Sequence, residues 1–173
     1  MTSYAVTSFL KDIQAGNIGE RIFIDDFLSF LKIRYENVTM KQGFQVIDTD
    51  FVALAGYYEI KTNYKDDHKI IIEEYTNINP ALSPVSYGWF YKSKADSLVF
   101  VSKETRTMIL IPFSREFKDH YETIKDNYPL IRNKITVHNG GKWQSAFRKI
   151  PLESINGYFA YYIKSMPPLF QPR

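Results

Sequence analysis

Apolar positions recur along the chain with two different periods, and each period predicts a different kind of element. Near the N-terminus, Ile24, Leu28, Leu31 and Tyr35 repeat at helical spacing. One amphipathic helix is therefore expected from Asn17 to about Tyr35, with this stripe buried. The later apolar runs are shorter and are separated by turn-forming residues, which is typical of strands.

Several of these runs have the length and composition of strands, and they cover residues 44–54, 57–62, 70–72, 98–102 and 107–113.

Helical character returns after Ser114, a residue type that caps helices, and we expect this helix to reach about Asn127 before Pro129 ends it. Residues 76–85 contain two prolines and are predicted to be a loop. Residues 157–164 are mostly aromatic and apolar, which predicts a final core helix or strand.

Two of the predicted strands carry polar residues that could meet at one point. The first run has Asp50 near its end, a break of two small residues follows, and the second run contains Glu59, Ile60 and Lys61. Alternation in a strand sends Glu59 and Lys61 to one face and Ile60 to the other. If the break is a hairpin turn, Asp50 returns beside Glu59.

Such a meeting of acids requires a cation or a shared proton, because two nearby carboxylates repel each other. Oxygen donors from Asp50, Glu59 and the backbone carbonyl of Ile60 suit Mg²⁺, and the Lys61 ammonium could orient a water or stabilise charge on a phosphate. Asp48 shares the parity of Asp50 and is a rival ligand, although Asp50 lies nearer the turn. An ordinary amphipathic hairpin with a surface Glu–Lys pair remains the alternative.

Composition narrows the class of protein. The 173 residues are 45% hydrophobic and 24% charged, as in a globular domain with its own core. We expect a single domain, residues 1–173, with a core at about 16–128 and a basic and aromatic extension at about 129–173. There is no cysteine and no apolar run long enough for a membrane span, so a cytoplasmic protein is expected.

A net charge of +3 favours a polyanionic partner without indicating a strong electrostatic DNA binder. Basic residues stand among aromatic ones in two places, which suits contacts with a nucleic-acid backbone, although a solvated basic face looks the same. The candidates for nucleic-acid binding are Lys92, Lys94, Lys142, Trp143, Arg148 and Lys149. Trp89, close to Lys92 and Lys94 in the sequence, could stack on nucleic acid, or it could close the core.

Asp50 and the Glu59-Ile60-Lys61 triplet together resemble the core motif of the PD-(D/E)XK, or restriction-endonuclease-like, nuclease superfamily. The likeness to small phage-type members continues downstream through HKIIIEEYTN, SYGWFYKSKADSLVFVS and TMILIPFSREFKDHY. It covers roughly residues 16–121, and this chain lacks the proline that can precede the first aspartate.

The resemblance implies a mixed central sheet flanked by helices, an α/β fold, and a Mg²⁺ or Mn²⁺ ion held by Asp50, Glu59 and the Ile60 carbonyl. It implies that Lys61 assists the attacking water. It also implies secondary acids, namely Glu20 on the first helix and Glu73 after the apolar triplet of the third run. Glu20 could equally close a capping box with Asn17, and Glu74 is the alternative to Glu73 because adjacent strand residues face opposite ways.

The sequence therefore predicts a metal-dependent endonuclease that hydrolyses phosphodiester bonds, with DNA the favoured substrate and RNA left open. A homodimer is expected if both strands of a duplex are cut. The alternative is a catalytically inactive protein on the same scaffold, either a nucleic-acid-binding subunit or a phage inhibitor that acts by interaction.

Overall fold

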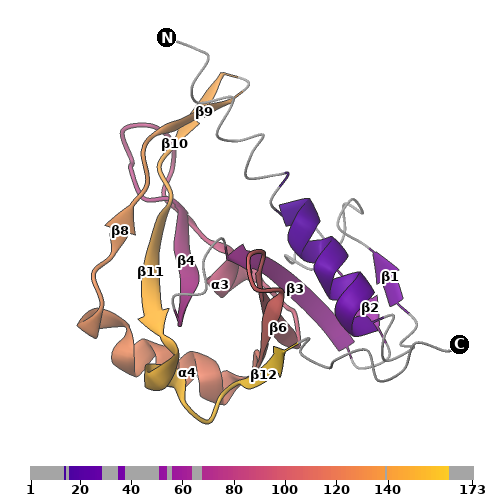
Figure 1. The fold of residues 1–173 in the computed structure, drawn as a ribbon. Helices are drawn as coiled ribbons and strands as arrows, with labels where there is room; N and C mark the ends of the chain where they lie inside the picture. The colour runs from indigo at the N-terminus through magenta and orange to yellow at the C-terminus, as the bar shows by residue number, and fades with distance from the viewer. Residues whose placement is uncertain are drawn as a thin grey trace, which may run out of the picture.

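The computed structural model describes Gln14 and residues 16–28, 35–37, 51–53, 56–63, 68–138 and 140–163. Its architecture is mixed α/β, as the sequence predicts, with helices and two larger β-sheets (Figure 1). Within the described ranges, no helix combines the length and the apolar character that crossing a bilayer requires.

The main sheet has six strands in the order β1-β2-β3-β6-β7-β12. The parallel pair within it is β3 with β6, and the remaining neighbours are antiparallel, so the sheet is mixed. Its strands are β1 (Tyr35–Asn37), β2 (Phe51–Ala53), β3 (Gly56–Asn63), β6 (Ser97–Ser102), β7 (Thr107–Pro112) and β12 (Ala160–Ile163).

The second sheet has four strands in the order β5-β4-β11-β8, and a separate two-stranded hairpin of β9 and β10 extends away from it at the top of Figure 1. The strands are β4 (Lys69–Asn77), β5 (Ser86–Tyr87), β8 (Ile131–Arg132), β9 (Thr136–His138), β10 (Gly141–Trp143) and β11 (Ala146–Pro151). The apolar triplet at 70–72 thus belongs to strand β4 of this second sheet. This strand is longer than the sequence predicts.

The helical elements after the first helix are α3 (Trp89–Lys92), α4 (Arg115–Ile124), η2 (Lys125–Asn127) and η3 (Leu152–Ile155). The Ser114 side chain accepts a hydrogen bond from the Phe117 amide at 3.3 Å, which confirms the predicted helix start. The short 3₁₀ turn η2 continues the chain to Asn127, where the sequence predicts the helix to end.

The predicted hairpin between the runs 44–54 and 57–62 is confirmed in its described part, strands β2 and β3. Phe51 pairs with Tyr58 and Ala53 pairs with Gly56, in antiparallel register. Gly56 has a φ of +124°, and a Cβ at this position would lie 2.4 Å from a carboxylate oxygen of Asp96. Glycine is therefore required here both by the backbone conformation and by the close approach of Asp96.

Asp96, the last residue of the Ser-Lys-Ala-Asp segment, fastens the start of β3 to its neighbours. Its carboxylate accepts a hydrogen bond from the Tyr57 amide at 2.9 Å, and its own amide donates to the Tyr57 carbonyl at 2.8 Å. Its carbonyl accepts from the Phe113 amide at 2.8 Å. This segment therefore has a structural role beside the hairpin.

The first helix differs from the expected one in its extent and in its buried face. It covers residues 16–23 and continues as a π-helical turn, η1 (Ile24–Leu28), whereas Tyr35 begins strand β1. The helical stripe predicted to include Tyr35 was therefore wrong at that end. Asn17 lies inside the helix, so a capping box that starts at Asn17 is not formed.

Of the predicted stripe, Leu28 is buried and Ile24 is partly buried, and Leu31 lies outside the described residues. The buried face also carries Gly19, Ile22, Phe23 and Asp26. Asp26 is 1% exposed and forms two hydrogen bonds with the Arg106 guanidinium, at 2.8 and 2.9 Å. Because Arg106 stands in the turn between β6 and β7, this pair ties the helix to the main sheet. The pair explains why an acidic residue occupies the inner face.

Both faces of the main sheet are covered. One face packs on the first helix, in a core formed by Ile22, Phe23, Leu28, Tyr58, Ile60, Val99, Val101 and Met108. The other face packs against the second sheet, α3 and α4, in a larger core rich in aromatic rings. Alternate residues of β6 and β7 enter opposite cores, so the central strands are buried on both sides.

The chain after residue 128 completes both sheets. Strand β11 pairs with β4 over most of its length, and β12 pairs with β7 at the edge of the main sheet. The region expected to be an extension is thus joined to the core by two strands, and the final apolar segment is a strand at Ala160–Ile163.

Candidate functional site

Glu59 and Lys61 stand on the same face of β3, as the sequence predicts. Their side chains form an ion pair between Lys61 Nζ and Glu59 Oε1. The Glu59 side chain is 3% exposed, whereas that of Lys61 is 28% exposed. The pair therefore runs from the protein interior to the solvent along one strand.

The surroundings of this pair come from the parallel neighbour and from α3. Leu98 and Phe100 of β6 are the register partners of Glu59 and Lys61. The Lys61 ammonium nitrogen lies 5.0 Å from the centre of the Trp89 ring, at the start of α3. A cation at this distance from an indole face is attracted to the ring. Trp89 is 7% exposed, so it closes the core, which was the structural alternative for this residue.

Ile60 lies between the two charged residues in sequence, but its side chain enters the core beneath the first helix. The predicted alternation along β3 is thus confirmed on both faces. The backbone of Ile60 stays with Glu59 and Lys61 on the central strand, so its carbonyl remains a candidate metal ligand.

Asp50 and its rival Asp48 lie outside the described residues. Asp50 precedes Phe51, the first residue of β2, and Phe51 pairs with Tyr58 directly before Glu59.

Glu20 is partly exposed on the first helix and lines a groove with Asn17, Ile18, Arg21 and Ile24. The inner stripe of the helix passes through Gly19 and Phe23 instead, so the inward orientation expected for Glu20 is not observed. The helix covers the face of the main sheet that carries Ile60, whereas Glu59 and Lys61 occupy the opposite face.

Glu73 and Glu74 face opposite sides of β4, and the inward residue is Glu74. Glu74 is 3% exposed, while Glu73 is partly exposed and accepts a hydrogen bond from the Thr76 hydroxyl at 3.5 Å. Glu73, which the sequence predicts as the secondary acid because it follows the apolar triplet, thus faces outward. The Glu74 carboxylate is engaged in an interior ion pair with Arg148.

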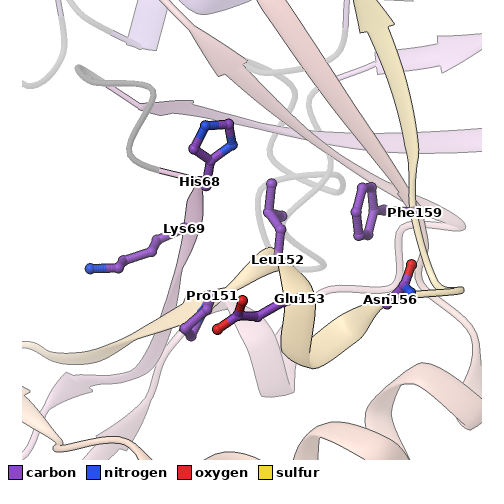
Figure 2. Close-up of a pocket in the computed structure, with 7 residues that line it drawn as sticks. All are labelled: His68, Lys69, Pro151, Leu152, Glu153, Asn156 and Phe159. Carbon is purple, nitrogen blue, oxygen red and sulfur yellow. The ribbon is translucent and has the colours of Figure 1, made fainter.

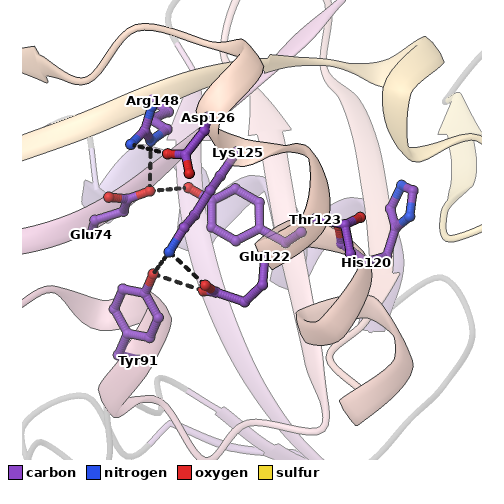
Figure 3. Close-up of polar contacts among 9 residues, drawn as sticks. Glu74, Tyr91, His120, Glu122, Thr123, Lys125, Asp126 and Arg148 are labelled. Atoms are coloured by element: carbon purple, nitrogen blue, oxygen red, sulfur yellow. Dashed lines mark hydrogen bonds and ion pairs between the residues drawn. The ribbon is translucent and has the colours of Figure 1, made fainter.

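Figure 3 shows this interior cluster, in which Arg148 of β11 meets Glu74 of β4. The Arg148 Nε atom donates to Glu74 Oε1 at 2.8 Å, and the Tyr121 hydroxyl donates to the same oxygen at 2.6 Å. A second donor nitrogen of Arg148 contacts Asp126 at 3.1 Å, and a third donates to the Tyr128 carbonyl. Three elements distant in sequence are held together by this one carboxylate.

Protonation equilibria in the cluster reflect its burial. Burial, followed by the hydrogen bond to Glu74, raises the pKa of Tyr121 far above its usual range. Burial disfavours the charged form of Arg148, but its hydrogen bond and attraction to Glu74 outweigh this effect and raise its pKa. The network therefore holds Arg148 charged and Tyr121 neutral at physiological pH.

The six residues predicted to bind nucleic acid lie on different elements of the fold. Lys92, Lys94, Lys142 and Lys149 are exposed, and Trp143 is partly buried on β10. The Arg148 side chain is 11% exposed and is directed into the interior cluster. Arg148 therefore does not present its guanidinium to solvent, which corrects the expectation that it contacts a phosphate backbone.

His68 stands in the segment before β4 with a φ of +53°, and its carbonyl accepts a hydrogen bond from the Leu152 amide at 2.9 Å. It lines a groove of about 480 Å³ with Glu153, Asn156 and Phe159 (Figure 2).

A metal ion is held in a protein by acidic or histidine side chains that gather in space. Within the described part of the chain, no three acidic or histidine side chains come together as a ready metal site. Glu59 supplies one carboxylate on β3, and Asp50 and Asp48, the acids predicted to stand beside it, lie outside the described residues.

No protein-family model matches this chain, and no curated protein or solved structure matches it.

Proposed function

We propose that the β2–β3 hairpin is the catalytic centre of a metal-dependent nuclease of the restriction-endonuclease-like kind. The observation that carries this proposal is the placement of Glu59 and Lys61 on one face of a central strand, with the acid buried and the ammonium reaching solvent. The hairpin itself and the mixed sheet around it are further support, since both were expected from the motif.

The proposal requires the β2–β3 pairing to continue by one residue beyond Phe51 and Tyr58. Such a continuation would bring Asp50 opposite Glu59. The two carboxylates and the Ile60 carbonyl are hard oxygen donors of the type that Mg²⁺ and Mn²⁺ prefer. When bound there, such an ion would polarise a phosphate and lower the pKa of a water molecule.

Lys61 provides the complementary chemistry at this centre. Its ammonium is a hydrogen-bond donor, so it can hold the oxygen of an attacking water or stabilise negative charge that develops on a phosphate oxygen. In the overall reaction, a water oxygen bonds to phosphorus and the bond from phosphorus to a sugar oxygen breaks. The products are a phosphomonoester and a hydroxyl group.

The exposed lysines supply the attraction that a polyanionic substrate needs. Lys92 and Lys94 flank the end of α3, whose first residue Trp89 contacts Lys61. These two lysines would therefore place positive charge for the backbone of DNA or RNA close in sequence to Trp89, which borders the proposed centre. Glu20 and Glu73 are left without a role in this proposal.

The test is cleavage of plasmid DNA, single-stranded DNA and RNA in MgCl₂, MnCl₂ or EDTA. We expect metal-dependent cleavage by the wild type and a loss of roughly 100-fold or more in the Lys61→Ala variant, because a group that assists the water contributes on this scale. Lys103→Ala is the matched control, since Lys103 is an exposed lysine in the turn between β6 and β7. Equal rates in the two variants would contradict the proposal, as would cleavage that persists in EDTA or is absent on every substrate.

A second candidate is a protein that binds nucleic acid or another protein on the same scaffold without turnover. It is favoured by one observation, which is that Glu59 already has an ammonium as its counter-charge. An acid satisfied in this way has no need of a metal ion. This candidate predicts binding of nucleic acid with the same affinity in EDTA and in MgCl₂, and no cleavage.

A further inference from the structure

We propose that Trp89 is the positioning residue for Lys61, and that its indole face keeps the ammonium at the hairpin when Glu59 binds a metal ion. This inference rests on the proposed function for its catalytic consequence. The contact itself is a feature of the fold and can be tested without any cleavage.

The first step is the geometry of the contact. Lys61 Nζ lies 5.0 Å from the Trp89 ring centre, within the distance of about 6 Å at which a cation is attracted to an aromatic face. Tryptophan is the strongest of the aromatic partners in this interaction. The contact joins a residue of β3 to a residue of α3, so it is made by the fold and not by the strand alone.

The second step is that the ring has a fixed position. Trp89 is buried against Phe90 and Phe100, with ring centres 6.1 and 6.2 Å away. The preceding Gly88 donates its amide hydrogen to the Glu74 carbonyl at 2.7 Å. A Cβ on Gly88 would lie 2.5 Å from the carbonyl oxygen of Glu73, so the chain passes close against β4 at this point.

The third step concerns the two partners of the ammonium. In this structure, Lys61 contacts both the Glu59 carboxylate and the Trp89 ring. A metal ion at Glu59 would compete with Lys61 for the carboxylate, and a lysine released to solvent is flexible about its four-carbon chain. The indole does not bind the metal, so it remains available to hold the ammonium beside the reacting phosphate.

Two substitutions separate this role from simple packing. Trp89→Leu removes the aromatic face and leaves an apolar side chain, while Trp89→Phe retains a weaker face. We expect Trp89→Leu to lower kcat about tenfold with KM changed less than about twofold, and Trp89→Phe to lie between Trp89→Leu and the wild type.

A direct reading comes from the NMR resonance of the Lys61 ε-methylene group, assigned by its loss in Lys61→Arg. The ring current of Trp89 should move this resonance upfield, and the shift should survive saturation with MgCl₂ and vanish in Trp89→Leu. Lys118 is an internal control, because its ammonium lies 3.9 Å from the Phe113 ring centre and should be unaffected by MgCl₂ and by Trp89→Leu.

An ordinary Lys61 shift in the wild type would overturn the inference, and so would one that collapses on addition of MgCl₂. A shift and a kcat that both persist in Trp89→Leu would also overturn it. If Trp89→Leu does not fold, an intermediate shift in Trp89→Phe supports the inference and an unchanged shift contradicts it. A wild type that cuts no nucleic acid would end the proposed nuclease function, whereas the resonance would still decide the role of Trp89.

Discussion

The molecule contains two Glu–cation pairs that are similar in chemistry and different in construction. Glu74 and Arg148 come from strands 74 residues apart in sequence, and both are almost fully buried. Glu59 and Lys61 are two residues apart on one strand, and the cation is partly exposed. The first pair exists because the fold brings its members together, whereas the second needs only an extended strand.

This difference indicates what each pair can do. The Glu74 carboxylate also accepts from Tyr121, and Arg148 also contacts Asp126 and the Tyr128 carbonyl, so movement of either partner would disturb several elements. The Lys61 side chain is 28% exposed, so solvent reaches it. A site for a substrate requires a solvent-accessible pair such as Glu59–Lys61. A structural joint requires a buried pair with several partners, such as Glu74–Arg148.

The largest effect on stability is expected when the interior pair is broken. Arg148→Met should lower the free energy of unfolding by about 3–5 kcal/mol, because it leaves the Glu74 carboxylate buried without its cation. Urea denaturation followed by circular dichroism measures this loss. A cost below about 1 kcal/mol would show that the cluster in Figure 3 is not a structural joint.

Replacing the cation at the hairpin by methionine should lower the free energy of unfolding by less. Lys61→Met is expected to lower the free energy of unfolding by about 1–2 kcal/mol, because the Lys61 side chain is partly exposed and solvent screens its ion pair with Glu59. Urea denaturation of both variants in one buffer gives the comparison. A loss as large as that of Arg148→Met would remove the distinction between the two pairs.

The smallest effect is expected at alkaline pH, at the partly exposed Tyr91 beside the interior cluster, where its hydroxyl donates a hydrogen bond to Glu122 at 2.9 Å (Figure 3). Burial, followed by the hydrogen bond to Glu122, raises the pKa of Tyr91 to about 12. The neutral form is thus favoured by folding, so its stabilisation is complete below about pH 10 and is lost as the pH rises to about 12. Thermal melts between pH 8 and pH 12 should show a steeper decline for the wild type than for Tyr91→Phe. Parallel declines would contradict this assignment.

Local features were predictable from the sequence where neighbouring residues determine them. The β2–β3 hairpin, the shared face of Glu59 and Lys61 and the Ser114 cap depend on strand alternation, small residues at a turn or a capping hydroxyl. Each of these signals lies within about a dozen residues of the feature that it predicts.

Features that depend on distant partners were not predictable in this way. The inner face of the first helix includes Asp26, which an apolar period excludes, because its cation Arg106 is 80 residues away. The sequence predicted that Arg148 is a surface cation. Its side chain instead points toward Glu74, because β11 pairs with β4. The choice between Glu73 and Glu74 likewise depended on which face of β4 meets the core.

The most direct test of the account is a calorimetric titration of the full chain with Mn²⁺. We predict one ion per chain, with binding weakened about tenfold or more in both Asp50→Asn and Glu59→Gln, because each variant removes a carboxylate ligand. Glu104→Gln, which changes an exposed acid in the turn between β6 and β7, should bind as the wild type does. Absence of binding, or equal affinity in all four proteins, would contradict a metal centre at the hairpin.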